Sequence, residues 1–166
     1  MNALQMELNQ GKLAQDKTQT YQRLLKQVEA LIDPNLGWVG NYANVCAAIQ
    51  QSFKHWWCGF YFVNSGRQLE LGPFQGPAAC TLIDFNKGVC GTAWARKETI
   101  IVPDVHQFEG HIACSAESNS EIVIPVKRSG NVIAVLDIDS TNFNEFDEID
   151  QDYLEQIVEL LPGIGG

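Results

Sequence analysis

Residues 121–139, EIVIPVKRSGNVIAVLDID, place two apolar runs on either side of the turn sequence Ser129-Gly130-Asn131. This arrangement predicts a β-hairpin, since β-prone runs joined by a short glycine-containing turn are the usual signal for one. Apolar side chains fall on both faces of the second strand, with Ile133 and Val135 on one face and Ala134, Leu136 and Ile138 on the other. A sheet that is apolar on both faces needs cover on both, and helices can supply it.

The rest of the chain follows the order helix, helix, hairpin, loop-rich middle, hairpin, helix. Apolar residues at helical spacing predict a first helix from Thr18 until Asp33-Pro34 ends it. Similar patterns predict a helix over 39–53, strands at 56–63, 69–74, 81–85 and 99–102, a short helix at 92–96, and a last helix over 147–161 with Asp147 as its N-cap. These elements predict one α+β domain over residues 18–162 with a mainly antiparallel sheet, preceded by a flexible segment, residues 1–17.

The composition narrows the class of function. The chain has 166 residues, enough for one domain with its own core, and carries a net charge of −9. This charge disfavours nucleic acids and anionic membrane surfaces as partners, because both are themselves negatively charged. The polar N-terminus has no apolar core of a signal peptide, and no apolar run approaches the roughly 18 residues that a membrane span needs. We therefore expect a cytoplasmic protein.

The chain contains five cysteines, which in a reducing cytoplasm are not expected to form structural disulfides. Cys46 and Cys58 lie within apolar patterns and are predicted to be core residues. Cys80, Cys90 and Cys114 lie beside glycine or in loops. Cys90 lies at a predicted helix N-terminus, where the helix dipole lowers the pKa of a thiol. A thiol reductase needs an attacking thiolate and a second, resolving thiol, so these three cysteines are candidates for redox chemistry.

Three acidic residues are predicted to lie close together in the sheet. Asp137 and Asp139 are two positions apart on one strand and therefore point to the same face. Glu121 begins the neighbouring strand of the hairpin. One interpretation is a solvated strand end. The other is a pocket for an ammonium group, in which one acid stays protonated and serves as a proton donor.

Possible metal ligands gather in the long polar loop over residues 103–120. It contains Asp104, His106, His111 and Cys114. No Cys-x-x-Cys or His-Glu-x-x-His motif accompanies them, so no metal site is predicted, and the two histidines are expected to be ordinary loop residues.

Two adjacent tryptophans, Trp56 and Trp57, would face opposite sides of a strand. One of them is expected in the core. The other either packs in the same way or lines a pocket that holds an apolar methyl group.

Several ordered motifs between Trp38 and Leu161 resemble those of the free methionine-(R)-sulfoxide reductases, a family of single GAF-domain proteins. The matching motifs are Gly59-Phe60-Tyr61, Leu71–Pro77 with Ala79-Cys80, Gly88–Ala93, Asp104-Val105, His111–Cys114, Ser120–Val123 and Val135–Ser140. The resemblance implies a GAF-like α+β fold with helices on both faces of the sheet. It does not extend to residues 1–17.

The resemblance also implies roles for particular side chains. Cys114 matches the cysteine that attacks the sulfoxide, and Cys90 and Cys80 match the resolving thiols, with their division of labour left open. The site acids, Glu121, Asp137 and Asp139, match those that bind the substrate ammonium and assist proton transfer, and Trp57 matches a tryptophan on the methyl side of the pocket.

The reaction implied is reduction of free L-methionine (R)-sulfoxide to methionine. Cys114 would become a sulfenic acid, condense with a second thiol, and be reset by an external dithiol such as thioredoxin, with no bound cofactor. The resemblance is compatible with a homodimer. Two alternatives stay open: a GAF module that senses a small ligand without catalysis, and a zinc protein that uses Cys114 and the loop histidines.

Overall fold

The computed structural model describes residues 3–110 and 116–164 and contains a six-stranded sheet. Its strands run in the spatial order β3-β2-β1-β6-β5-β4, and every neighbouring pair is antiparallel. In chain order they are β1 (Trp57–Val63), β2 (Gln68–Gln75), β3 (Leu82–Asp84), β4 (Ile100–Val102), β5 (Ser120–Arg128) and β6 (Asn131–Ser140). The predicted α+β class with an antiparallel sheet is confirmed.

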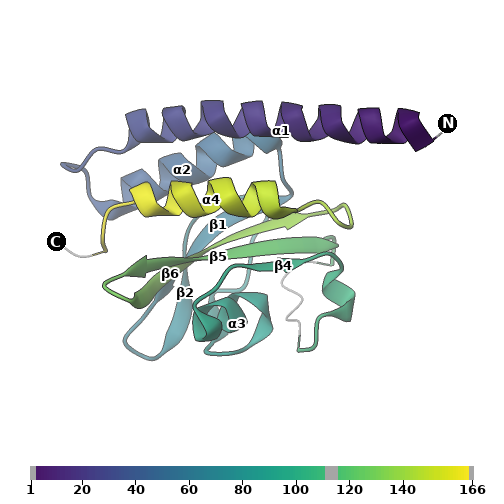
Figure 1. Cartoon of the computed structure of the whole chain (residues 1–166). Coiled ribbons are helices and arrows are strands. Elements are labelled where there is room, and N and C mark those ends of the chain that lie inside the picture. The colour runs from purple at the N-terminus through teal and green to yellow at the C-terminus, as the bar shows by residue number, and fades with distance from the viewer. Residues whose placement is uncertain (1–2, 111–115, 165–166) are drawn as a thin grey trace.

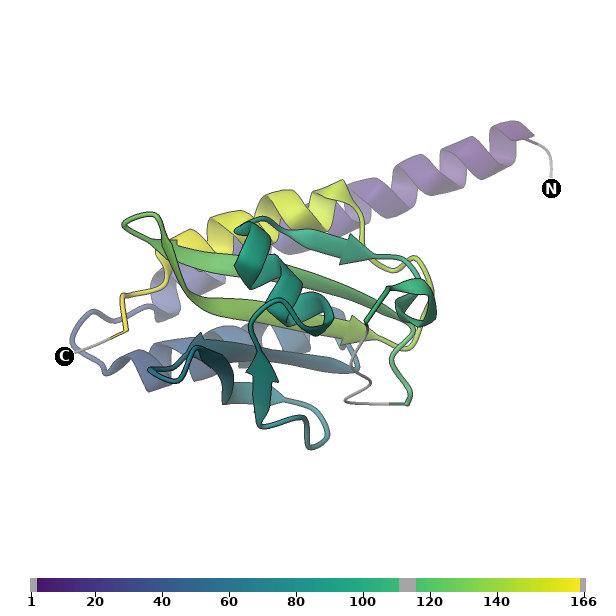
Figure 2. The same cartoon turned by 90° about the horizontal axis from the view of Figure 1, so that it is seen from below.

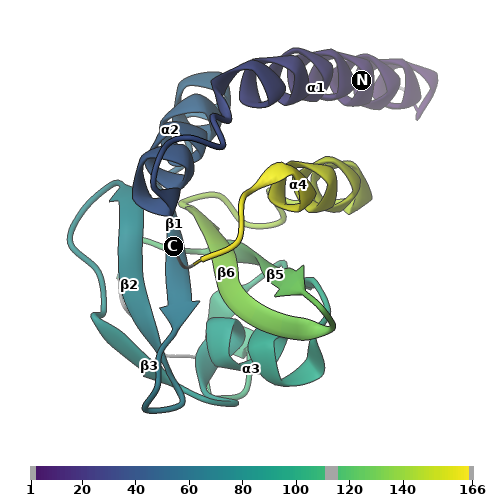
Figure 3. The ribbon, with the colours of Figure 1, turned by 90° about the vertical axis from the view of Figure 1, so that its left-hand side faces the viewer.

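Helices cover both faces of this sheet, as Figures 1 and 3 show. They are α1 (Ala3–Leu31), α2 (Trp38–Phe53), α3 (Gly88–Arg96), the short 3-10 helix η1 (Val105–Gln107) and α4 (Glu148–Leu160). The long helices α1, α2 and α4 lie on one side, and α3 crosses the other side, which faces the viewer in Figure 2. Within the two described ranges, no helix combines the length and the apolar character needed to cross a membrane.

The β5–β6 hairpin separates two apolar clusters, as the alternation of its residues predicts. Ala134, Leu136 and Ile138 are fully buried on the side of α1, α2 and α4, and Val135 is buried on the side of α3. The prediction for Ile133 is wrong, because it packs on the same side as Leu136. A register shift between Val126 and Lys127 interrupts the alternation there, as a β-bulge does.

Cys46 on α2 and Cys58 on β1 are both fully buried in the cluster under the long helices, which confirms their prediction as core residues. Both are free thiols. Burial, with a hydrogen bond to Cys46, raises the pKa of the Cys58 thiol well above its ordinary value. A thiol that stays protonated is a poor nucleophile, so Cys58 is inert in this position.

The first helix begins at Ala3 and not at Thr18, where the sequence predicts its start, so α1 extends into the segment expected to be flexible. Lys17 holds this part of α1 to the start of α4, with its Nζ 2.6 Å from Asp150 Oδ2 and 3.0 Å from Asp147 Oδ2. Tyr21 donates a hydrogen bond to the other oxygen of Asp150 at 2.7 Å. Asp147 is the N-cap of α4, as predicted, and forms a capping box with Asp150.

We predict that Lys17→Met lowers the free energy of unfolding by about 2–4 kcal/mol, because it leaves the buried carboxylate of Asp150 without its cation. Urea unfolding monitored by circular dichroism measures this change. Lys12→Met, an exposed position on the same helix, is the matched control and should change stability by less than about 0.5 kcal/mol. Equal effects of the two substitutions would contradict the role given to Lys17.

Candidate functional site

A pocket lies between α3 and the sheet, on the side opposite the long helices. Its walls come from β1, β5, β6, the first turn of α3 and the segment that follows β2. The lining residues are Trp57, Tyr61, Pro77, Ala78, Ala79, Ile83, Gly88, Val89, Cys90, Ser118, Glu121, Asp137 and Asp139. One part of the pocket wall is therefore apolar and aromatic, while the neighbouring part is acidic.

The acidic wall follows directly from strand pairing. Glu121 on β5 is the register partner of Asp139 on β6, and Asp137 lies two positions further along β6 on the same face. Glu121 and Asp137 are only 6% and 7% exposed. The predicted convergence of the three acids is confirmed. The interpretation as a solvated strand end is wrong for Glu121 and Asp137, because the pocket buries both.

Burial and mutual repulsion favour the protonated forms of these acids, each to a different extent. Both effects raise the pKa of Glu121 and of Asp137 well above the ordinary carboxyl values. Burial also raises the pKa of Asp139, to about 6, although the hydroxyl of Ser118 opposes this change. Asp139 is therefore the acid that ionises most readily near neutral pH, and the other two retain protons in the absence of a bound cation.

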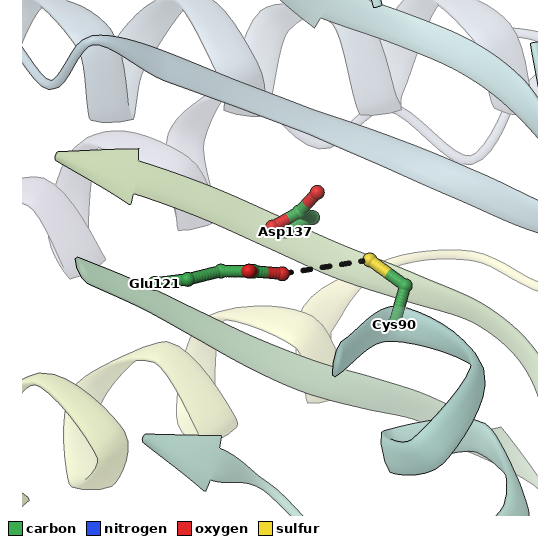
Figure 4. A group of neighbouring side chains, drawn as sticks. All are labelled: Cys90, Glu121 and Asp137. Carbon is green, nitrogen blue, oxygen red and sulfur yellow. Dashed lines mark hydrogen bonds between the residues drawn. The ribbon is translucent and has the colours of Figure 1, made fainter. Parts of the chain in front are cut away.

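Cys90 completes the acidic wall from the side of α3. Figure 4 shows its thiol pointing toward Glu121, with Asp137 beside both, and Cys90 Sγ donates a long hydrogen bond of 4.0 Å to Glu121 Oε1. The prediction that the helix dipole lowers the pKa of this thiol is wrong. Burial and the adjacent carboxyl groups raise the pKa of Cys90 well above its ordinary value, and they outweigh the dipole.

Ser118 is a site residue that the sequence analysis missed. It is 3% exposed, and its hydroxyl donates a hydrogen bond of 2.5 Å to Asp139 Oδ1. The residue lies in a polar loop without periodicity, so no pattern in the sequence distinguishes it from its exposed neighbours. Only the position of the loop beside the end of β6 brings it to the carboxylate.

The aromatic wall contains Trp57, which lines the pocket as predicted. Its ring stacks on Tyr61 with the ring centroids 5.8 Å apart and on Phe74 at 5.5 Å. Gly59 makes room for this stack, because a Cβ atom there would lie 2.4 Å from the indole ring. Trp56 precedes β1 and packs on the same side as Trp57, so the expectation that the two face opposite sides is wrong.

The segment that carries Cys80 is attached to the aromatic wall. Trp57 Nε1 donates a hydrogen bond of 3.1 Å to the carbonyl oxygen of Pro77, and the hydroxyl of Tyr61 donates one of 3.0 Å to the carbonyl oxygen of Cys80. Cys80 is disulfide-bonded, whereas Cys90 is a free thiol.

The remaining candidates lie in the polar loop. Cys114 and His111 are outside the described residues. Asp104 caps η1, and His106 contacts the side chain of Asn119 at 3.1 Å. The potential metal-ligand cluster found among the described residues is instead that of Cys90, Glu121 and Asp137, in the pocket.

We predict a pH-dependent stability difference between Asp139→Asn and the wild-type protein. The raised pKa of Asp139 means that its contribution to stability is complete below its unfolded pKa near 4 and is lost as pH rises through about 6. Asparagine does not titrate, so the variant should gain about 1 kcal/mol relative to wild type between pH 5 and pH 7.5.

The difference between the two proteins is needed because the buried His55, whose pKa burial lowers to about 4, gives wild-type stability an opposing slope. Urea unfolding at several pH values measures it, with the exposed Asp152→Asn as control. A difference that does not change with pH would contradict the raised pKa of Asp139.

The fold and the site can be compared with known proteins. The family model of the GAF domain matches residues 14–161. Free methionine-R-sulfoxide reductase of Saccharomyces cerevisiae is 42% identical over 154 residues, which cover 88% of this chain and 86% of the yeast protein. The Escherichia coli protein of the same name is 43% identical over 147 residues, or 88% of each chain.

A solved structure extends the comparison. Free methionine-R-sulfoxide reductase from Neisseria meningitidis, in complex with its substrate, superimposes with a TM-score of 0.85 at 44% identity and covers 87% of each chain. The predicted resemblance and the predicted GAF-like fold are therefore confirmed. The chain belongs to the free methionine-R-sulfoxide reductases, which are built on the GAF domain.

Proposed function

We propose that this chain reduces free L-methionine (R)-sulfoxide to methionine by cysteine chemistry in the pocket between α3 and the sheet. The observation that carries the proposal is the acidic wall formed by Glu121, Asp137 and Asp139. No lysine, arginine or histidine is among the described residues that line the pocket. The wall therefore lacks a counter-charge that a substrate ammonium group would supply.

This charge distribution explains why the substrate is the free amino acid. The α-ammonium group of free methionine sulfoxide would lie against the acids. Asp139 is the acid that is ionised near neutral pH, so it would form the ion pair with this group. A methionine sulfoxide within a peptide has an amide at that position and brings no positive charge. The aromatic wall of Trp57 and Tyr61 offers an apolar surface to the methyl group.

Cys114 is the proposed nucleophile. Its thiol attacks the sulfoxide sulfur, and the oxygen is transferred to Cys114 as methionine leaves, so the sulfoxide is reduced while the thiol becomes a sulfenic acid. The acids whose pKa values are raised, Glu121 and Asp137, hold protons at neutral pH and can protonate the sulfoxide oxygen as its bond to sulfur weakens. We assign the donor role to Glu121 and the ammonium contact to Asp139.

Cys80 is the proposed resolving thiol. It condenses with the sulfenic acid of Cys114, which forms a disulfide and releases water. The disulfide-bonded state of Cys80 supports this role over one for Cys90, which is a buried free thiol with a raised pKa. An external dithiol, for which we propose thioredoxin in the cytoplasm, then reduces the disulfide by exchange. A homodimer stays a prediction.

We predict that the three cysteine variants separate these steps. Cys114→Ser should release no methionine. Cys80→Ser should release about one methionine per protein and then stop, because the sulfenic acid has no partner thiol. Cys90→Ser should retain most of the thioredoxin-coupled activity. Single-turnover methionine release and NADPH oxidation with thioredoxin and thioredoxin reductase measure the two steps. Full turnover by Cys80→Ser and none by Cys90→Ser would reverse the assignment of the resolving thiol.

We predict that Asp139→Asn lowers kcat/KM for the free R epimer by about 100-fold or more, through loss of a charged partner in a desolvated pocket. The free S epimer and a peptide-bound sulfoxide should be poor substrates of the wild-type protein. Coupled assays with resolved epimers test this prediction. Absence of turnover with every substrate, with all thiols still reduced, would instead favour a GAF module that senses a ligand.

A further inference from the structure

We propose that the reduced pocket is also a binding site for a thiophilic divalent cation such as Zn²⁺, held by Cys90, Glu121 and Asp137, and that this cation competes with the substrate. Binding of the ion does not depend on the proposed function. Only the competition does, because it assumes that the substrate ammonium lies against Asp139 in the same pocket, next to the acids that hold the ion.

The geometry of the three side chains suits a small cation. One ligand atom from each, a thiol sulfur and two carboxyl oxygens, lies within 4.8 Å of the others, and the sulfur is 4.0 Å from the nearer Glu121 oxygen. In a tetrahedral zinc site the sulfur and oxygen ligands are roughly 3.5 Å apart. The three ligand atoms therefore need to move only slightly closer together to bind an ion. They come from three different elements that converge on the pocket, as Figure 4 shows.

An unused acceptor points to a missing ligand. The side chain of Asp137 is buried, with only 7% of the residue exposed. Its Oδ1 has no hydrogen-bond partner among the residues that the structure describes. A buried carboxyl oxygen without a partner is costly, and it is rare in native proteins unless an ion or ligand completes it. The oxygen belongs to a residue that lines the pocket, so a cation entering the pocket can reach it.

The kinds of ligand atom select the kind of cation. A sulfur ligand favours zinc and other thiophilic ions over magnesium and calcium, which take oxygen ligands in larger numbers. Three protein ligands leave a fourth tetrahedral position for water. On binding, the ion displaces the protons that these side chains hold, so no electron transfer is involved. A cation there would cover both Glu121 and Asp137 and exclude an ammonium group by charge and by volume.

The experiment uses Co²⁺ as a spectroscopic substitute for Zn²⁺ with the full-length, fully reduced protein. Cobalt bound to a thiolate gives a sulfur-to-metal charge-transfer band in the near ultraviolet. We expect this band in the wild-type protein, its bleaching by Zn²⁺, and its loss in Cys90→Ser with at least about a tenfold weaker affinity for the ion. Asp137→Asn should weaken affinity but keep the band. Cys46→Ser, which removes a buried thiol on the other side of the sheet, is the matched control and should behave as wild type.

Competition is measured by adding free methionine, which carries the same ammonium group as the substrate, and N-acetylmethionine, which lacks it. With the free Co²⁺ concentration corrected for the ion that methionine itself chelates through its amino and carboxylate groups, free methionine should still raise the apparent dissociation constant of Co²⁺, and N-acetylmethionine should leave it unchanged. A band that persists in Cys90→Ser, or one that disappears in Cys114→Ser, would overturn the assigned site. A band indifferent to methionine would overturn the competition. Because cobalt binding requires no turnover, a protein that binds the ion at Cys90 but reduces no sulfoxide would refute the proposed function and leave the metal site intact.

Discussion

The register of the β5–β6 hairpin is the constraint on which the site depends. It sets Glu121 opposite Asp139 and keeps Asp137 on the same face, below α3. Opposing carboxyl groups repel each other when both are ionised, and burial of a carboxyl group has a further cost even when it is protonated. The fold accepts both because the rest of the hairpin buries Val123 and Val135 on this side and a larger apolar cluster on the other. A shift by one residue would send the acids into the opposite core, so the same packing that stabilises the hairpin fixes the acidic wall.

Two groups of buried acidic side chains in this molecule differ in how the cost of burying a carboxyl group is offset. Asp150 is 1% exposed, and Lys17 and Tyr21 contact its two oxygens, so its charge is satisfied within the protein. The pocket acids have no basic side chain among the described lining residues and keep protons instead. The first arrangement stabilises the join between α1 and α4. The second leaves buried acids with no basic side chain among the described lining residues, so a bound cation can pair with them once they ionise, at a cost to stability.

Much of this fold could be predicted because its signals are local. The alternation over residues 121–139 predicts the hairpin and the meeting of its acids, and Asp147 marks the start of α4 by its capping chemistry. The errors have non-local causes. Lys17 on α1 has partners that lie about 130 residues away in the chain, where no local pattern reveals them. The thiol of Cys90 is buried and meets carboxyl groups from two distant strands, and burial together with these groups outweighs the effect of its helix on the thiol pKa. Ser118 has no periodicity to identify it, and its role depends on where a loop crosses the end of β6.

The hydrogen bonds from Trp57 and Tyr61 to the segment of Cys80 connect the shape of the pocket with the redox state of this cysteine. The two rings line the pocket and also hold the backbone of the segment that carries the disulfide-bonded Cys80, so this segment and the pocket wall are physically connected. A ligand that prefers the reduced form must, by thermodynamic linkage, raise the reduction potential of the disulfide by the same free energy. In the proposed reaction, occupancy of the pocket would then affect how readily an external dithiol reduces Cys80, and the redox state of Cys80 would affect how tightly the pocket binds its ligand.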